Sequence, residues 1–206
     1  MTSAAGAVFA QNLLVNGSFE TETAANGYGS YQLNSAAAPD GWSFAPSAAI
    51  TDSTATTYRT AEDGTWSIQM GAFGDPNSDS SPAQSSYDSL QQSVQTTAGD
   101  TYTLSYWLTD YYSSGSFVFN ATWNGAVIAG TQESLNVPYG TWTEYTATVT
   151  GTGGMDTLGL NGYDGPSFGG LDNVSLVQNQ AAPSPAGVFA LGLGVVGLIA
   201  LRRRSA

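Results

Sequence analysis

The sequence has no cysteine, no histidine and no lysine among its 206 residues. Without cysteine and histidine, a thiolate–imidazole pair, a Ser-His-Asp triad and a zinc site of the usual ligands are excluded. Without lysine, Schiff-base catalysis and a phosphate-binding P-loop are excluded as well. The chemistry that remains is that of carboxylates and other oxygen ligands.

Positive charge is scarce and unevenly placed. The chain has 4 basic residues against 16 acidic ones, which gives a net charge of −12. Three of the bases are Arg202, Arg203 and Arg204 at the C-terminus, so the rest of the chain carries −15, with Arg59 as its single base. A body of this charge repels phosphate backbones, and we therefore expect no nucleic-acid partner.

Residues 187–201 form an unbroken apolar run, and the basic tail 202–206 follows it directly. Together with Ala186, this run would span about 24 Å as a helix, slightly less than the hydrocarbon core of a bilayer at about 30 Å. We predict a short C-terminal transmembrane helix in the inner membrane. The positive-inside rule then keeps the arginines cytoplasmic and places the body in the periplasm. The alternative is a buried core helix.

A short proline motif, Pro183-Ser184-Pro185, lies within the segment 180–186 just before the apolar run. Proline motif, apolar helix and terminal arginines together resemble the PEP-CTERM sorting signal. That resemblance implies an exosortase-type sorting enzyme as a partner, cleavage near the motif, and a final location at the cell surface or outside it. The sequence departs from the family at Ser184, where the family has a glutamate.

Residues 1–10 have the character of a signal-peptide remnant. Val8 and Ala10 suit the −3 and −1 positions of a cleavage site, although the preceding apolar stretch is short and lacks a basic start. We interpret this segment as the end of a signal peptide, with a mature chain that begins near Gln11. A short disordered N-terminus is the alternative.

Residues 11–179 show no convincing helical pattern and instead alternate apolar and polar positions. In residues 101–110, the side chains of Tyr102, Leu104, Tyr106 and Leu108 share one face, which leaves Trp107 on the other. Asn124-Gly125 marks a hairpin turn. Residues 24–61 and 73–87 are typical of loops. We predict an all-β sandwich of about nine or ten strands. The expected strands are 13–15, 66–70, 89–94, 101–110, 116–123, 126–129, 141–149, 157–160 and 171–177.

The order of several short motifs resembles the carbohydrate-binding-module-like, or galactose-binding-like, jelly rolls. The opening strand matches at 12–20 (NLLVNGSFE) and the "GW" element at 40–42. A "Q…G-x-x-Y-x-L" element follows at 90–104, and the closing strand matches at 171–176 (LDNVSL). The resemblance covers nearly the whole body and implies a jelly-roll β-sandwich domain over residues 11–179.

The resemblance also implies one structural calcium ion. In these jelly rolls the first and last strands run close together, and a glutamate and an aspartate there enclose a hard cation with backbone carbonyls. The matching residues are Glu20 and Asp172. Calcium takes six to eight oxygen ligands, so these two carboxylates would be a partial set. The alternative is that Glu20 only ends a strand and Asp172 caps backbone amides.

Aromatic residues are the candidate sugar-binding groups, because flat rings stack on the apolar faces of sugars. We select Trp107, which lies opposite the expected core face, and the pair Tyr111 and Tyr112 at the end of the same strand. The alternative is that these are ordinary core and strand-surface residues.

The sequence as a whole predicts an exported, non-enzymatic protein of the cell envelope or extracellular matrix. Its β-sandwich would serve adhesion or weak binding of extracellular polysaccharide. One alternative is a purely structural matrix protein without a ligand. Another is a carboxylate-based glycosidase or lyase, for which Glu62, Asp63, Glu133 and Glu144 are available.

Overall fold

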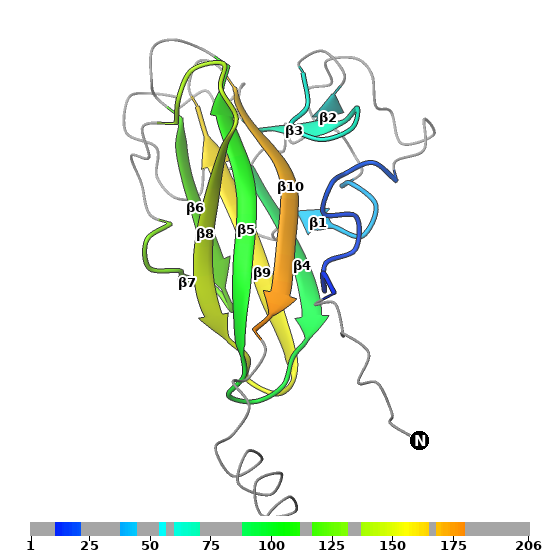
Figure 1. Cartoon of the computed structure of the whole chain (residues 1–206), viewed down its shortest axis with the longest axis vertical. Helices are drawn as coiled ribbons and strands as arrows, with labels where there is room; N and C mark the ends of the chain where they lie inside the picture. The colour runs from blue at the N-terminus through cyan, green and yellow to red at the C-terminus, as the bar shows by residue number, and fades with distance from the viewer. Residues whose placement is uncertain are drawn as a thin grey trace, which may run out of the picture.

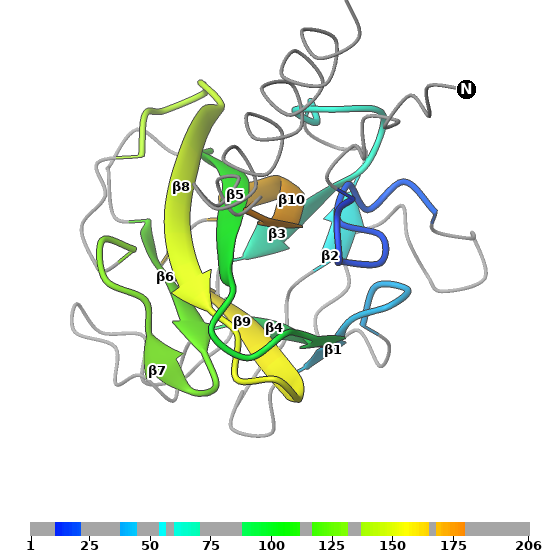
Figure 2. The ribbon, with the colours of Figure 1, turned by 60° about the horizontal axis from the view of Figure 1, so that its bottom comes forward.

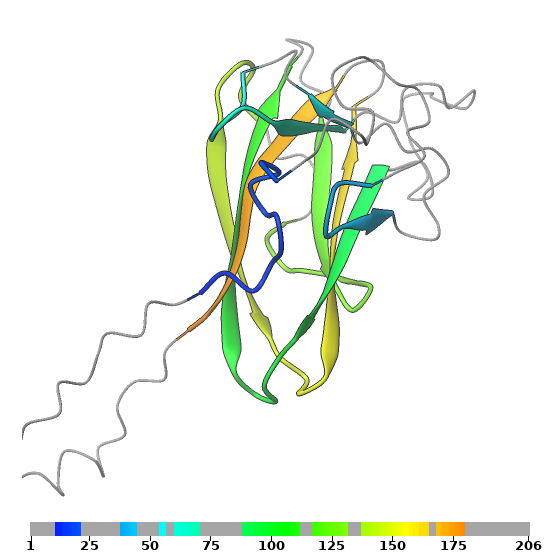
Figure 3. The same cartoon turned by 90° about the vertical axis from the view of Figure 1, so that its right-hand side faces the viewer.

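The computed structural model describes residues 11–21, 38–44, 54–56, 60–70, 88–111, 117–131, 137–164 and 168–179. These residues form two five-stranded sheets packed face to face, as the side view in Figure 3 shows. The first sheet has the order β1-β4-β9-β6-β7 and the second has the order β2-β3-β10-β5-β8. Neighbouring strands in both sheets are antiparallel. The predicted all-β sandwich is therefore confirmed for the described part of the chain.

The strands of each sheet come from distant parts of the sequence (Figure 1). The first sheet consists of β1 (Ser43–Phe44), β4 (Asp88–Gln95), β9 (Met155–Tyr163), β6 (Val118–Trp123) and β7 (Ala126–Val127). The second consists of β2 (Thr54–Thr56), β3 (Ser67–Met70), β10 (Gly169–Gln178), β5 (Thr101–Asp110) and β8 (Thr143–Thr150). Viewed toward its lower end in Figure 2, the molecule has the two sheets on opposite sides of the core.

The core lies between the sheets and is built by the alternation seen in the sequence. Leu104 and Leu108 of β5 are fully buried on its inner face, and Leu158 and Leu160 of β9 are fully buried in the facing sheet. The ring of Tyr106 lies 5.0 Å from that of Phe119, which comes from the opposite sheet. The predicted core face of residues 101–110 is confirmed, and it fixes the direction in which every other side chain of the second sheet points.

The longer strands agree with the prediction in place and nearly in length. The strand predicted at 101–110 is β5 itself, and 89–94, 157–160 and 171–177 lie within β4, β9 and β10. The hairpin between β6 and β7 turns at Asn124 and Gly125, with φ angles of 52° and 81°. Both angles lie in the left-handed region that a type I′ turn requires, which is why this dipeptide is favoured there.

Two parts of the strand prediction were wrong. Residues 13–15 form no strand, because Asn12 makes a single bridge to Val177 and the chain then turns at Asn16 and Phe19, both with positive φ. The region 24–61, interpreted as loop, contains β1 and β2. These strands have two and three residues, too few for alternation to show.

Several predicted segments lie outside the described residues. They are the signal-peptide remnant 1–10, the proline motif 180–186, the apolar run 187–201, the basic tail 202–206 and the ligand candidate Tyr112. Within the described ranges, no helix is long and apolar enough to cross a membrane.

Candidate ligand-binding face and calcium site

Trp107 lies on the outer face of the second sheet. Its neighbours in β5, Tyr106 and Leu108, point into the core, so the indole projects to the other side, where it is half-buried. In register it stands between the exposed Glu144 of β8 and the buried Asp172 of β10. The prediction that Trp107 lies opposite the core face is confirmed.

Hydroxyl side chains continue from Trp107 along the same face of three adjacent strands. In register, Ser105 lies between Thr146 and Ser175, Thr103 pairs with Thr148, and Thr101 pairs with Thr150. We call these seven residues the hydroxyl face: Thr101, Thr103, Ser105, Thr146, Thr148, Thr150 and Ser175. They are exposed or half-exposed. Ser105 and Ser175 share a 2.8 Å hydrogen bond between their Oγ atoms.

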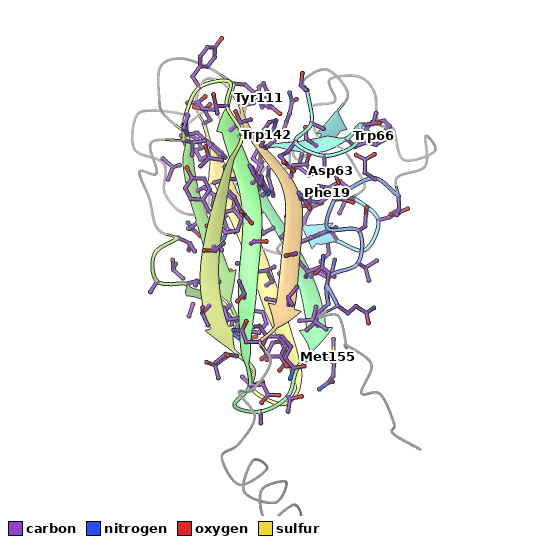
Figure 4. All side chains as sticks on the ribbon, viewed as in Figure 1. Phe19, Asp63, Trp66, Tyr111, Trp142 and Met155 are labelled. Atoms are coloured by element: carbon purple, nitrogen blue, oxygen red, sulfur yellow. The ribbon has the colours of Figure 1, made fainter. Side chains whose placement is uncertain are left out.

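Tyr111, the second candidate ligand-binding residue, is buried. Its hydroxyl lies 3.4 Å from Ser67 Oγ. Its ring meets that of Trp142 edge-on at a centroid distance of 6.2 Å (Figure 4). Trp142 in turn donates from Nε1 to the carbonyl of Thr60, at 3.0 Å. Trp107 and Tyr111 therefore form no common stacking surface, and Tyr111 packs the upper end of the second sheet against the segment that begins at Thr60.

Glu20 holds the same segment from another side. Its Oε1 accepts the backbone N–H groups of Thr65 at 2.8 Å and Trp66 at 2.6 Å. Gly64, with φ +67°, lies so close that a Cβ there would be 2.3 Å from Glu20 Cδ. Only glycine fits this combination of left-handed backbone and close approach.

Asp172 is the third anchor of this segment and is fully buried. Its Oδ2 accepts the amides of Glu62 at 2.9 Å and Asp63 at 3.3 Å, and its Oδ1 accepts that of Asn173 at 2.7 Å. The pKa of the Asp172 carboxyl is raised to about 7, because burial outweighs the three amide hydrogen bonds that act to lower it; the nearby charge of Glu62 also acts to raise it. We call residues 60–66 the anchored loop.

The chemistry of these donors fits a hard cation. Glu20, Glu62 and Asp172 all contact the anchored loop or belong to it, and each of the three carboxylates accepts a hydrogen bond there. Among the described residues, no group of three or more acidic, histidine or cysteine side chains is placed to hold a metal ion. The calcium ion that the resemblance implies at Glu20 and Asp172 stays a prediction, and in the structure both carboxylates accept backbone amides.

The acids considered for catalysis are placed as follows. Glu62 Oε2 accepts from Asn173 Nδ2 at 3.0 Å, so this carboxylate is held within the anchored loop. Asp63 and Glu144 are exposed, the latter on the open outer face of β8. Glu133 lies outside the described residues. No local pattern indicates that Glu62 lies beside Asp172, because 110 positions separate the two residues.

No protein-family model matches the chain, and no curated protein matches it. Solved structures share its fold. A cyclase from Fischerella sp. TAU matches with a TM-score of 0.55 at 18% identity, over 85% of this chain and 100% of the other. The N-terminal CBM22-1–CBM22-2 tandem domain of Paenibacillus barcinonensis Xyn10C matches with a TM-score of 0.52 at 16% identity, over 87% of this chain and 50% of the tandem. A family 16 carbohydrate-binding module gives 0.49 at 16% identity, over 81% and 99%. The chain thus has a β-sandwich fold that carbohydrate-binding modules and an enzyme both use.

Proposed function

We propose that the β-sandwich binds extracellular polysaccharide through the outer face of its second sheet and serves adhesion or matrix building. The observation that carries this proposal is the position of Trp107, an indole on an open sheet face beside a carboxylate and a row of hydroxyls. An aromatic surface with a few polar groups around it is the usual composition of a sugar-binding site.

The placement of the acidic side chains favours binding without catalysis. Glycoside hydrolysis needs two carboxyl groups that face each other across the scissile bond. Glu62 is engaged by Asn173, and Glu144 stands on an exposed strand face. The fold is similar to that of a tandem of carbohydrate-binding modules and to that of a cyclase, so the fold does not distinguish binding from catalysis. The positions of the acidic side chains support this part of the proposal.

We further propose that the chain is exported and sorted through its C-terminus. Residues 187–201 would anchor it in the inner membrane with the body in the periplasm, and an exosortase-type enzyme would recognise the segment around Pro183 and Pro185. The support is the order of proline motif, apolar run and Arg202–Arg204 in the sequence. One calcium ion at Glu20 and Asp172 would stabilise the sandwich and take no part in binding.

A panel of soluble and insoluble polysaccharides tests the binding proposal. We expect Trp107→Ala to weaken binding about tenfold, through loss of the stacking surface. Tyr139→Ala is the matched control, because Tyr139 is an aromatic residue with 62% exposure that lies outside the sheet face. An unchanged affinity in Trp107→Ala would place the site elsewhere. If no polysaccharide is bound, the protein is a structural component without a ligand, and turnover that Glu144→Gln abolishes would make it an enzyme.

A further inference from the structure

The hydroxyl face is a regular array. β5 and β8 pair without interruption from Thr101–Thr150 to Leu108–Thr143, so their outward side chains lie in straight cross-strand rows. Neighbouring strands are about 4.8 Å apart, and outward residues in one strand are about 7 Å apart. Ser175 of β10 adds a third column beside Ser105. Figure 1 shows the three strands side by side on one face of the molecule.

This array carries no charge. All seven members of the hydroxyl face are serine or threonine, with the exposed Glu144 beside Trp107 at one end and the half-buried Asp100, which accepts from Gln178, at the other. The rest of the body has a net charge of −15 and a single arginine, which repels anionic polymers such as uronic-acid polysaccharides. The hydroxyl face itself contains no carboxylate that could form ion pairs with a cationic polymer. The charge pattern therefore selects an uncharged partner.

The array also has low relief. Serine and threonine are short, Val177 pairs with Thr103 in the β10 column, and the Asn179 side chain hydrogen-bonds to the hydroxyls of Thr101 and Thr103 at one end of the array. A single soluble chain is normally bound in a groove that surrounds it, whereas a flat array contacts a flat surface. Thr146, Thr148 and Thr150 are exposed, and within the described part of the chain their hydroxyls make no side-chain hydrogen bond. Single hydroxyl contacts are weak in water, so several must form at once.

We propose that the hydroxyl face binds an uncharged polysaccharide in its packed, insoluble form, lying flat across β8, β5 and β10 with Trp107 stacked at one end. This inference rests on the proposed function and adds the class and physical state of the ligand. Many parallel chains in one surface supply the repeated hydroxyls that the array needs for simultaneous contact.

The test is a sedimentation assay with the purified full chain. The probes are microcrystalline cellulose and chitin as uncharged solids, hydroxyethyl cellulose and cello-oligosaccharides as uncharged soluble ligands, and calcium-free alginate as an anionic one. We expect retention on an uncharged solid, with affinity for the soluble ligands at least about tenfold lower. We expect no retention on alginate.

Thr148→Gln tests the array itself, because it places a longer uncharged side chain in the middle of the hydroxyl face and would hold a flat surface away from the neighbouring hydroxyls. We expect about tenfold weaker retention on the solid, with Thr146→Gln as a second variant. Ser93→Gln is the control, an exposed strand position on the outer face of the opposite sheet. Melting temperatures verify that each variant is folded.

The outcomes separate this inference from the proposed function. Equal affinity for soluble and insoluble ligands, still lost in Trp107→Ala, would overturn the inference and leave polysaccharide binding intact. Retention on the solid that Thr146→Gln and Thr148→Gln do not change would also overturn it. Failure to bind any of the polysaccharides would overturn both.

Discussion

A single buried carboxylate, Asp156, ties together one end of the sandwich, next to Met155 at the lower end of Figure 4. It accepts hydrogen bonds from Thr96 Oγ1 at 2.5 Å and Asn124 Nδ2 at 2.7 Å. It also accepts two from Thr152, through the amide at 2.9 Å and Oγ1 at 2.6 Å. One side chain therefore connects three separate turns, and we expect the stability of this end to depend on its charge.

We predict that Asp156→Asn lowers the free energy of unfolding by about 3 kcal/mol at pH 7, because bonds to a charged acceptor are lost and an amide group is introduced among donors. Burial acts to raise the pKa of Asp156, but the bonds from Thr152, Thr96 and Asn124 outweigh it and hold this pKa well below its ordinary value of 3.8. The stabilisation is therefore present above the ordinary value and is lost as the pH falls toward the lowered one.

Urea unfolding between pH 7 and pH 2 measures both effects. The wild type should lose stability more steeply below about pH 4 than Asp156→Asn does. Asp100→Asn is the control, since Asp100 is only half-buried and accepts from Gln178 near the surface, and its loss should cost less than about 1 kcal/mol. Equal pH profiles for Asp156→Asn and the wild type would contradict the prediction.

At the scale of elements, the anchored loop joins the start of the domain to its closing strand. Glu20 comes from the turn that follows the first bridge, and Asp172 comes from β10. Both carboxylates accept amides of the same seven-residue segment, which also carries the Trp142 contact at Thr60. The loop is thus held from three sides, and it leads directly into β3, which pairs with β10.

We predict that calcium raises the melting temperature of the wild type and that a chelator lowers it by about 5 °C, through binding to the folded state alone. Glu20→Gln keeps an acceptor for the Thr65 and Trp66 amides but removes a charged ligand, so it should abolish the response. Asp40→Asn, an exposed position outside the loop, should retain it. A chelator without effect on the wild type would mean that amide hydrogen bonds alone hold the loop.

The sequence predicted the elements that repeat a local rule and missed those that depend on distant contacts. The alternation of apolar and polar residues predicted both β5 and the face on which Trp107 lies. A strand of ten residues repeats this pattern often enough for it to be recognised. The family resemblance paired Glu20 with Asp172. It could not show that residues 60–66 lie between them, nor that Trp142 reaches Thr60, because no local pattern encodes a contact across 82 positions. Tyr111 was selected as a candidate sugar-binding residue because it follows the end of a strand, but its side chain is buried.

At the scale of the whole molecule, the charge is divided between two parts with different roles. The body carries −15 and the last residues carry three arginines. A positive cluster directly after an apolar run resists translocation, whereas the acidic body can cross to the far side of the membrane. Under the sorting proposal, the same division of charge would direct the chain through the membrane and keep the acidic sandwich away from anionic surfaces.

We predict that the body fractionates outside the inner membrane in a host with an exosortase-type enzyme, and that mass spectrometry finds a mature C-terminus within residues 182–186. Replacement of Arg202, Arg203 and Arg204 by alanine should reduce sorting, and Ser184→Glu, which restores the family residue, should raise the cleaved fraction. Recovery of residues 191–204 intact in the cytosol would contradict the sorting proposal.

The two ends of the described domain leave it side by side, since Asn12 bridges to Val177 and the amide of Leu13 bonds to the carbonyl of Leu176. β10 is an interior strand of its sheet, with β5 on one side and β3 on the other. Force applied at the C-terminus therefore runs along β10 and loads its ladder hydrogen bonds in shear, all together, because those bonds lie perpendicular to the strand. Under the sorting and binding proposals, β10 would bear the tension between a tethered C-terminus and a surface held at the sheet face, with ladder bonds to both β5 and β3.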